Sequence, residues 1–218
     1  MRCRKTLLTR FVNLEKPNLS ENGSEVSDSF DLRLSKDLQN QAMAKHKIGD
    51  MNAAINLYSQ ACKTLENVGK PNMEITFTHA AALNALAAGL SEVGEYDKAM
   101  LYAERSLELR KGLLGKKHLA VGESLTTIGT IQFAMGRLSR ACESFESALT
   151  VILSVCKDKE DSPIVALAFF NVGIVYIRSA ELRDEGIKAL KKSSRIAESV
   201  FGPNHPQTLI IKSSILDQ

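Results

Sequence analysis

Several residue types that would indicate a reactive site are scarce in this chain of 218 residues. It has no tryptophan, 6% aromatic residues, four cysteines and four histidines. The cysteines form no CxxC pair, and no two histidines stand four residues apart on one helix face, so the pattern predicts no metal site and no disulfide framework. Cysteine usage of this kind is typical of a reducing, intracellular compartment.

Other absences narrow the function further. No apolar run approaches the length of a membrane span, so we expect no transmembrane segment. The stretch at residues 112–117 lacks the spacing of a phosphate-binding loop, and no nucleophile lies near a base, so we expect no catalytic residue, no cofactor, no small-molecule substrate and no enzyme. A net charge of +3 does not require a polyanionic partner. We read the basic cluster of Lys188, Lys191, Lys192 and Arg195 as a solvated helix face, and nucleic acid is not the expected partner.

What the chain does have is a pattern that returns every 42 to 45 residues. Each copy is centred on a turn residue, namely Gly49, Gly94, Gly136 or Ala180. Small residues precede each turn by seven positions, at Ala42, Ala87, Gly129 and Gly173. Small residues also follow each turn, at Ala54, Ala99, Ala141 and Gly186, and four positions later stand Tyr58, Ala103, Phe145 and Leu190. Small residues that face each other let two helices approach closely, and a fixed period of this length predicts a solenoid of helical hairpins.

The breaks between copies set the expected domain boundaries. We predict an all-α fold, a right-handed α-solenoid of four helical hairpins at about residues 35–68, 74–114, 119–156 and 162–201. A last helix over residues 207–216 has no helix after it, so we expect it to cap the array and to pack partly on the fourth hairpin. Ser162 and Pro163 suit the start of a helix, as a capping hydroxyl and a first-turn proline.

The spacing of the small residues, the turn and the step from Ala to an aromatic residue resemble the tetratricopeptide repeat (TPR) family. The long period resembles its kinesin-light-chain type, in which the linker reads roughly L-G-x-x-H-P. This chain keeps Gly115 and His118 in one linker and Gly202, His205 and Pro206 in another. The resemblance covers about residues 35–218. It implies an α-solenoid with protein partners but names none of them, because TPR arrays have many unrelated partners.

In TPR arrays the first helix of each pair lines a concave groove, and this implies a set of partner-binding residues. The set comprises Gln39, Asn40, Met43, Asn84, Thr126, Thr127, Thr130, Phe133, Phe170, Asn171, Ile174 and Arg178. An asparagine amide both donates and accepts, so Asn84 and Asn171 suit the backbone of an extended peptide. Phe133, Phe170 and Ile174 suit an apolar anchor side chain. The alternative is that these residues pack against the C-terminal helix.

Two functions follow from this reading. The first is a protein–protein interaction scaffold or adaptor that binds a partner segment in the concave groove. The second is a structural subunit or assembly factor of a larger complex, which uses its convex face and C-terminal helix. One TPR class grips a free C-terminal carboxylate with lysine, arginine and asparagine. The corresponding positions here include Gln39, Met43, Glu123 and Thr127, so we expect no such carboxylate clamp.

Residues 1–34 do not carry the repeat pattern. The first 14 residues contain Arg2, Arg4, Lys5 and Arg10 but no acid, and an apolar helix face would comprise Cys3, Leu7, Phe11 and Leu14. A basic, acid-free amphipathic start is typical of organelle transit peptides. We therefore expect a flexible N-terminal segment and a cytoplasmic protein, with a mitochondrion or plastid as the alternative location.

Overall fold

The computed structural model describes residues 28–66, 68, 72–157 and 161–216. Within these ranges all regular secondary structure is helical and there is no strand, which confirms the predicted all-α class. The expectations for residues 1–27 lie outside the described part of the chain.

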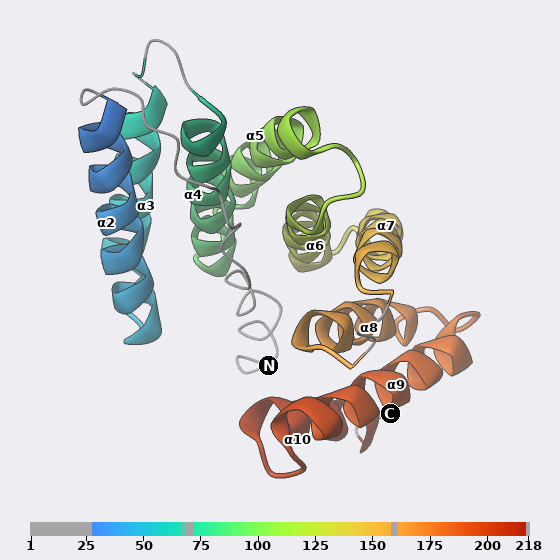
Figure 1. Cartoon of the computed structure of the whole chain (residues 1–218). Helices are drawn as coiled ribbons and strands as arrows, with labels where there is room; N and C mark the ends of the chain where they lie inside the picture. Colours follow the sequence, from blue (N-terminus) through green and yellow to red (C-terminus); the bar gives the residue numbers. More distant parts are fainter. Residues whose placement is uncertain (1–27, 67, 69–71, 158–160, 217–218) are drawn as a thin grey trace. The chain divides into compact units, whose positions relative to one another are not determined.

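The helices alternate with short turns and longer linkers, as the repeat pattern predicts (Figure 1). They are α2 (Asp28–Lys47), α3 (Met51–Glu66), α4 (Met73–Glu92), α5 (Tyr96–Leu114), α6 (Leu119–Ala134), α7 (Leu138–Val155), α8 (Pro163–Tyr176), α9 (Arg183–Phe201) and α10 (Pro206–Leu216). The outer ends of each hairpin, and both ends of α10, lie within two residues of the expected boundaries, with one exception at the start of α2.

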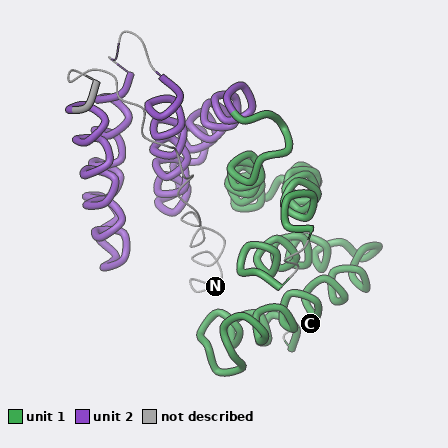
Figure 2. The backbone as a smooth tube through the Cα atoms, in the orientation of Figure 1, with its two compact units in different colours: residues 1–11, 114–218 green, residues 12–113 purple. Residues whose placement is uncertain are grey.

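The chain divides after Leu113 into two compact units, whose described parts are residues 28–113 and 114–216 (Figure 2). In the first unit α2 packs on α3 and α3 packs on α4. In the second unit each helix packs on the next along the chain, from α6 to α10. Both units are therefore built from contacts between helices that are neighbours in sequence.

Helix α2 begins at Asp28, seven residues before the start expected from the repeat pattern. Its extra turns carry Phe30 and Leu34 with their side chains exposed, so they add no helical periodicity of buried residues. Asp31 lies in the first turn and favours a helix start here, because an acidic side chain near the N-terminus stabilises the helix dipole. Because residues 18–29 are mostly polar, the sequence carries no apolar pattern that indicates this helix start.

Three of the predicted turns share one backbone geometry. The glycines have positive φ angles of 84°, 89° and 75° at Gly49, Gly94 and Gly136. The amide of each glycine donates to the carbonyl three residues back, and the next amide donates to the carbonyl five residues back, as from Asp50 to Lys45. This is a Schellman ending, which favours glycine because other residues are strained at such φ values. The fourth turn, around Ala180, runs over residues 177–182 without a glycine.

The small residues of the repeat lie where the paired helices come closest, as predicted. Ala42, Ala87, Ala54, Ala99 and Ala141 have no exposed surface. A Cβ atom built at Gly129 would lie 2.7 Å from the ring of Phe145, and one at Gly173 would lie 2.7 Å from Cγ of Leu190. In these two hairpins, Phe145 and Leu190 therefore fill the space that the glycine of the facing helix leaves open.

A buried hydroxyl joins the two helices in three of the hairpins. Ser35 Oγ donates to the Ala61 carbonyl at 3.0 Å, and Ser193 Oγ donates to the Ala166 carbonyl at 2.7 Å. Ser106 Oγ of α5 likewise donates to the Ala80 carbonyl of α4 at 2.7 Å, so the second helix supplies the hydroxyl in the α4–α5 and α8–α9 hairpins and the first helix supplies it in the α2–α3 hairpin. In the repeat register the third hairpin has Gly122 and Ala148 at these positions, and the Gly122 carbonyl accepts instead from Thr126.

The linker histidines cap the helices that follow them. His118 Nδ1 accepts from the amide of Ala120 at 3.2 Å, and His205 Nδ1 accepts from the amide of Gln207 at 3.3 Å. Each imidazole thus caps the start of the helix that follows it. The predicted cap at Ser162 is only half confirmed: Ser162 and Pro163 do start α8, but the Ser162 hydroxyl makes no capping hydrogen bond.

Candidate partner-binding surface

The first helices of the hairpins differ from the second helices in how completely they are buried. Nearly all of α8 between Ile164 and Val175 is buried, and so is most of α6 between Ala120 and Ile131. Helix α9 instead buries one face and exposes a polar one. A helix that is covered on all sides presents little open surface. Most of the predicted groove residues on α6 and α8 therefore lie beneath the surface.

The predicted residues on α2 and α4 fall into two groups. Asn40 is exposed, while Gln39 and Met43 are half-buried, and Gln39 Nε2 donates to Ser35 Oγ at 3.3 Å. Asn84 is fully buried in α4. Only the α2 residues therefore present a polar surface that a partner can contact without a rearrangement.

The three predicted threonines of α6 use their hydroxyl protons within their own helix. Thr126 donates to the Gly122 carbonyl at 3.0 Å, and Thr130 donates to the Thr126 carbonyl at 2.9 Å. Thr127 donates in the same way to Glu123 at 3.2 Å. Each hydroxyl has one proton to donate, so these side chains can only accept from a ligand.

The two predicted asparagines are the most unusual polar groups in the described chain. Asn84 is 0% exposed and Asn171 is 1% exposed. In both residues the amide nitrogen and the amide oxygen have no hydrogen-bond partner among the described residues. A buried polar group without a partner costs about 1–3 kcal/mol, and such groups are few in native proteins. Each of these amides would gain from a ligand that supplies one donor and one acceptor.

The remaining residues of the predicted site fall into a buried group and an accessible group. Phe170 and Ile174 belong to a buried hydrophobic cluster that also contains Ile211 of α10. Phe133 is half-buried and Arg178 is exposed, and the Arg178 guanidinium lies 5.9 Å from the centre of the Phe133 ring. The structure thus brings Phe133 and Arg178 together as an accessible pair, whereas Phe170 and Ile174 serve the core. Whether any of the four binds a partner stays a prediction.

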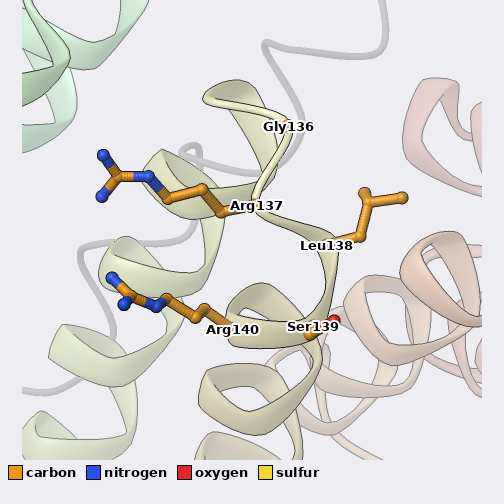
Figure 3. Close-up of a pocket in the computed structure, with 5 residues that line it drawn as sticks. All are labelled: Gly136, Arg137, Leu138, Ser139 and Arg140. Atoms are coloured by element: carbon orange, nitrogen blue, oxygen red, sulfur yellow. The ribbon is translucent and has the colours of Figure 1, made fainter.

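A shallow pocket that sequence analysis did not identify lies at the turn between α6 and α7. It has a volume of about 520 Å³ and is lined by Gly136, Arg137, Leu138, Ser139 and Arg140 (Figure 3). The two arginine side chains extend to the same side, and Leu138 points away from them. In the other hairpins the turn residue is followed by an acid (Asp50, Glu95 and Glu181), so the charge reversal at Arg137 is the signal that sequence analysis could have used.

The thiols of Cys62 and Cys142 are poor nucleophiles. Burial raises the pKa of Cys62 to about 12, with a smaller contribution from Glu66. Burial and a hydrogen bond to Glu146 raise the pKa of Cys142 to about 12. The same carboxylate accepts from Tyr176 Oη at 2.5 Å, so it holds two protonated neighbours. A thiol with so high a pKa is protonated at neutral pH, whereas covalent catalysis needs a thiolate.

The described residues show neither a metal site nor a membrane-spanning helix. No group of three or more histidine, cysteine, aspartate or glutamate side chains in the described ranges could hold a metal ion. No helix among the described residues is both long and apolar enough to cross a membrane. Two basic residues of α9 have local partners, since Lys188 pairs with Glu185 at 3.7 Å and Lys192 lies 4.4 Å from the centre of the Phe169 ring.

Comparison with known proteins matches the middle part of the chain to a family. Residues 78–154, from within α4 to within α7, match the tetratricopeptide repeat family. This stretch of the chain resembles tetratricopeptide repeats. The buried small residues and glycine turns described above are the features on which the resemblance in the sequence was based, and the match confirms it.

Two curated proteins are similar to the chain over about two thirds of its length. The chain is 22% identical over 145 residues to the Arabidopsis thaliana protein KINESIN LIGHT CHAIN-RELATED 3, an alignment that covers 66% of this chain and 22% of that protein. It is also 22% identical over 147 residues to KINESIN LIGHT CHAIN-RELATED 2 of the same plant, covering 67% and 21%. The matched TPR region therefore spans about a fifth of the length of these curated relatives.

A solved structure supports the same fold. The crystal structure of BtubC (BKLC) from P. vanneervenii is similar with a TM-score of 0.69 at 19% sequence identity. The similarity covers 88% of this chain and 75% of the other. At this identity the comparison establishes the fold, that of a TPR solenoid of helix hairpins, as predicted.

Proposed function

We propose that this chain is an interaction scaffold or adaptor, and that it binds an extended segment of a protein partner along the first helices of its hairpins. The single observation that carries the proposal is the pair of buried, unpartnered amides of Asn84 and Asn171. Both lie on first helices, α4 and α8. The likeness to kinesin light chain-related proteins supports a role in protein binding.

The chemistry of the amides selects the kind of partner. A carboxamide presents one acceptor and two donor hydrogens, which complements the N–H and C=O of a peptide backbone. Because each amide is covered in the free chain, binding requires a local opening of α4 or α8 at that point. The exposed Asn40 and the Phe133–Arg178 pair are the groups that a partner can contact before such an opening.

The proposal makes a prediction in which stability and binding change in opposite directions. Asn171→Leu replaces the unpartnered amide by an apolar side chain of similar volume, so the free chain should keep or raise its melting temperature. The same change should abolish binding of the partner, because the backbone of the bound segment would lose its hydrogen bonds to the amide. Both can be measured, by thermal denaturation and by affinity purification of the tagged chain with mass spectrometry.

The matched control is Ser139→Ala, an exposed polar residue near the start of α7 that lies outside the predicted groove. It should change neither the melting temperature nor the proteins recovered. A partner that is recovered equally with the wild type and with Asn171→Leu would contradict the proposal. So would a large fall in the melting temperature of Asn171→Leu, because the amide would then be stabilising the free fold.

The second function, a structural subunit or assembly factor, draws support from a different surface. Leu209 and Leu216 of α10 are exposed, and they lie on the opposite side of that helix from its packed face. Stoichiometric co-purification with the same set of large subunits, unaffected by Asn171→Leu, would favour this second function.

We place the protein in the cytoplasm, with a mitochondrion or plastid as the alternative, which imaging of a C-terminally tagged chain would decide.

A further inference from the structure

The turn between α6 and α7 differs in charge from the other three hairpin turns. Arg137 stands where each of the others has an acid, and Arg140 follows three residues later. In the first hairpin the acid has two partners, since Asp50 Oδ1 accepts from the amide of Ala53 at 3.3 Å and Oδ2 lies 3.5 Å from Lys45 Nζ. Arg137 has no acceptor atom in its side chain, so it cannot take over this stabilising role.

Two arginines at this turn are unfavourable for the free fold. Arg137 is the residue directly before α7, where it makes no side-chain capping hydrogen bond, and the first turn of α7 has no acid. A positive charge at the start of a helix opposes the helix dipole, and like charges that are neighbours on a helix repel each other. The stability of the hairpin therefore does not account for Arg137 and Arg140.

The guanidinium groups of both residues are available to a ligand. Arg137 and Arg140 are exposed, and neither has an ion pair or a hydrogen bond to any residue in the described ranges. Both side chains extend to the same side of the shallow pocket of about 520 Å³, while Leu138 and Ser139 point the other way (Figure 3). A ligand that approaches from that side therefore meets two guanidinium groups without a partner.

The charge of the pair selects the ligand. A phosphate monoester carries a charge of about −1.5 to −2 at neutral pH and has three acceptor oxygens. It therefore matches two guanidinium groups both in charge and in its capacity for paired hydrogen bonds, whereas a single carboxylate would leave one cation without a partner. We propose that Arg137 and Arg140 form a binding site for one phosphorylated side chain of a protein partner.

The shape of the pocket indicates that the phosphate belongs to a larger molecule. A site for a small molecule encloses most of its ligand, whereas this pocket is formed by the five consecutive residues 136–140 at one turn. A free phosphate metabolite would find few contacts here besides the two arginines. A protein partner supplies the further contacts from its own interface with the chain.

Nearby carboxylates argue against a polyanionic partner. Glu143 lies one turn further along α7, and the turn between α8 and α9 carries Glu181 and Asp184. That turn lies close to the end of α6, because the Arg178 guanidinium is 5.9 Å from the centre of the Phe133 ring. Nucleic acids and anionic membranes bind surfaces on which many cations are spread. The acids around the arginine pair would repel such a partner, whereas a single phosphate can pair with the two guanidinium groups alone.

The first test uses a capped pentapeptide, Gly-Gly-phosphoserine-Gly-Gly, and the same peptide without the phosphate. In a nuclear magnetic resonance titration of the isotope-labelled full chain, the phosphopeptide should shift the backbone amides of Gly136 and Arg137. An exposed site with two ion pairs should give a dissociation constant on the order of millimolar. Equal shifts with the unphosphorylated peptide, or no shifts with either, would overturn the proposal.

This site does not rest on the groove of the proposed function. Asn171 is buried within α8, whereas both arginines lie at an exposed turn. The groove is tested by the proteins recovered with Asn171→Leu, and the arginine pair is tested by the phosphopeptide. A failure of one test therefore leaves the result of the other unaffected.

The second test restores the acid that the other hairpins have. Arg137→Glu should weaken phosphopeptide binding roughly tenfold or more, because it replaces one of the two cations by an anion. It should also raise the melting temperature of the free chain, because an acid at the start of α7 favours the helix dipole and the repulsion from Arg140 is removed. Arg195→Glu is the matched control, since Arg195 is exposed on α9 and lies outside the pocket. Equal binding by Arg137→Glu and Arg195→Glu would overturn the proposal.

Three further probes distinguish this site from other anion-binding surfaces. The pentapeptide with glutamate in place of phosphoserine should bind more weakly than the phosphopeptide, and equal binding would contradict recognition of a phosphate. Phosphatidylserine vesicles and oligouridine should leave the amide of Gly136 unshifted. If either of them shifts this amide and the phosphopeptide does not, the arginine pair belongs to a membrane or nucleic-acid surface and the proposal fails.

Discussion

At Gly129 the absence of a side chain is required by a single neighbour. A Cβ atom there would lie 2.7 Å from two carbon atoms of the Phe145 ring, a distance that real contacts essentially never show. Gly112 in α5 has nothing within 4 Å of the same position, although it too lies inside a helix. The two glycines therefore have opposite roles, although the sequence shows each as a glycine in a helical pattern.

This contrast predicts opposite effects of the same substitution. Gly129→Ala should lower the free energy of unfolding by about 1–3 kcal/mol, because the added methyl group overpacks the helix pair. Gly112→Ala should raise it by about 0.5–1 kcal/mol, because alanine is the better helix former and meets no neighbour. Urea denaturation of both variants measures the difference. Equal shifts in the same direction would show that the approach of Phe145 does not limit position 129.

At the scale of the elements, the hairpin is held by more than apolar contact. Three hairpins place a serine hydroxyl against a carbonyl of the paired helix, and the serine belongs to the first helix in α2 but to the second helix in α5 and α9. The bond therefore depends on the facing positions and not on which helix supplies the hydroxyl. This hydrogen bond sets the position of one helix along the axis of the other.

We expect Ser106→Ala to lower the free energy of unfolding by about 0.5–1.5 kcal/mol, the net worth of one intramolecular hydrogen bond. Ser106 has no exposed surface, so water cannot replace the lost donor. Ser147→Ala in α7 is the control, because that serine is exposed. Urea midpoints that coincide for the two variants would mean that the buried hydroxyl does not stabilise the hairpin.

At the scale of the whole molecule, the repeats distribute charge in a way that bears on the partner. The positions that would clamp a free carboxylate hold Gln39 and Met43 on α2 and Glu123 and Thr127 on α6. None of these side chains is a cation, and Thr127 donates its proton to its own helix. A desolvated carboxylate would find no charge-assisted partner among these four side chains.

We therefore predict that peptides with an acidic C-terminus bind no better as the free acid than as the amide. Amidation removes the negative charge of the peptide's C-terminus. This should not weaken binding, because none of the clamp positions supplies a positive charge. Fluorescence anisotropy with paired peptides, identical except for amidation, makes the comparison. Binding of the free acid alone, at least tenfold tighter than the amide, would show that cations elsewhere in the chain serve as a clamp.

The sequence by itself determined the hairpins. The period, the turn glycines and the small residues at Ala42, Ala87, Gly129 and Gly173 depend on contacts between helices that are adjacent along the chain, and such contacts repeat whenever the pattern repeats. The histidine caps at His118 and His205 are local in the same sense. The hairpin bounds expected from the sequence differ from the observed helix ends by at most two residues, except at Asp28, where exposed Phe30 and Leu34 give no periodic signal.

Only the tertiary structure decided which of these residues are accessible. Asn84 and Asn171 read as groove residues in the sequence, yet their amides are buried, and Phe170 belongs to the core while Phe133 remains half-exposed. Exposure depends on what other helices cover, and a one-dimensional pattern does not contain that information. Helix α10 shows the same limit, because the sequence predicts only that it packs in part, whereas the structure shows that Ile211 is buried and that Leu209 and Leu216 are exposed.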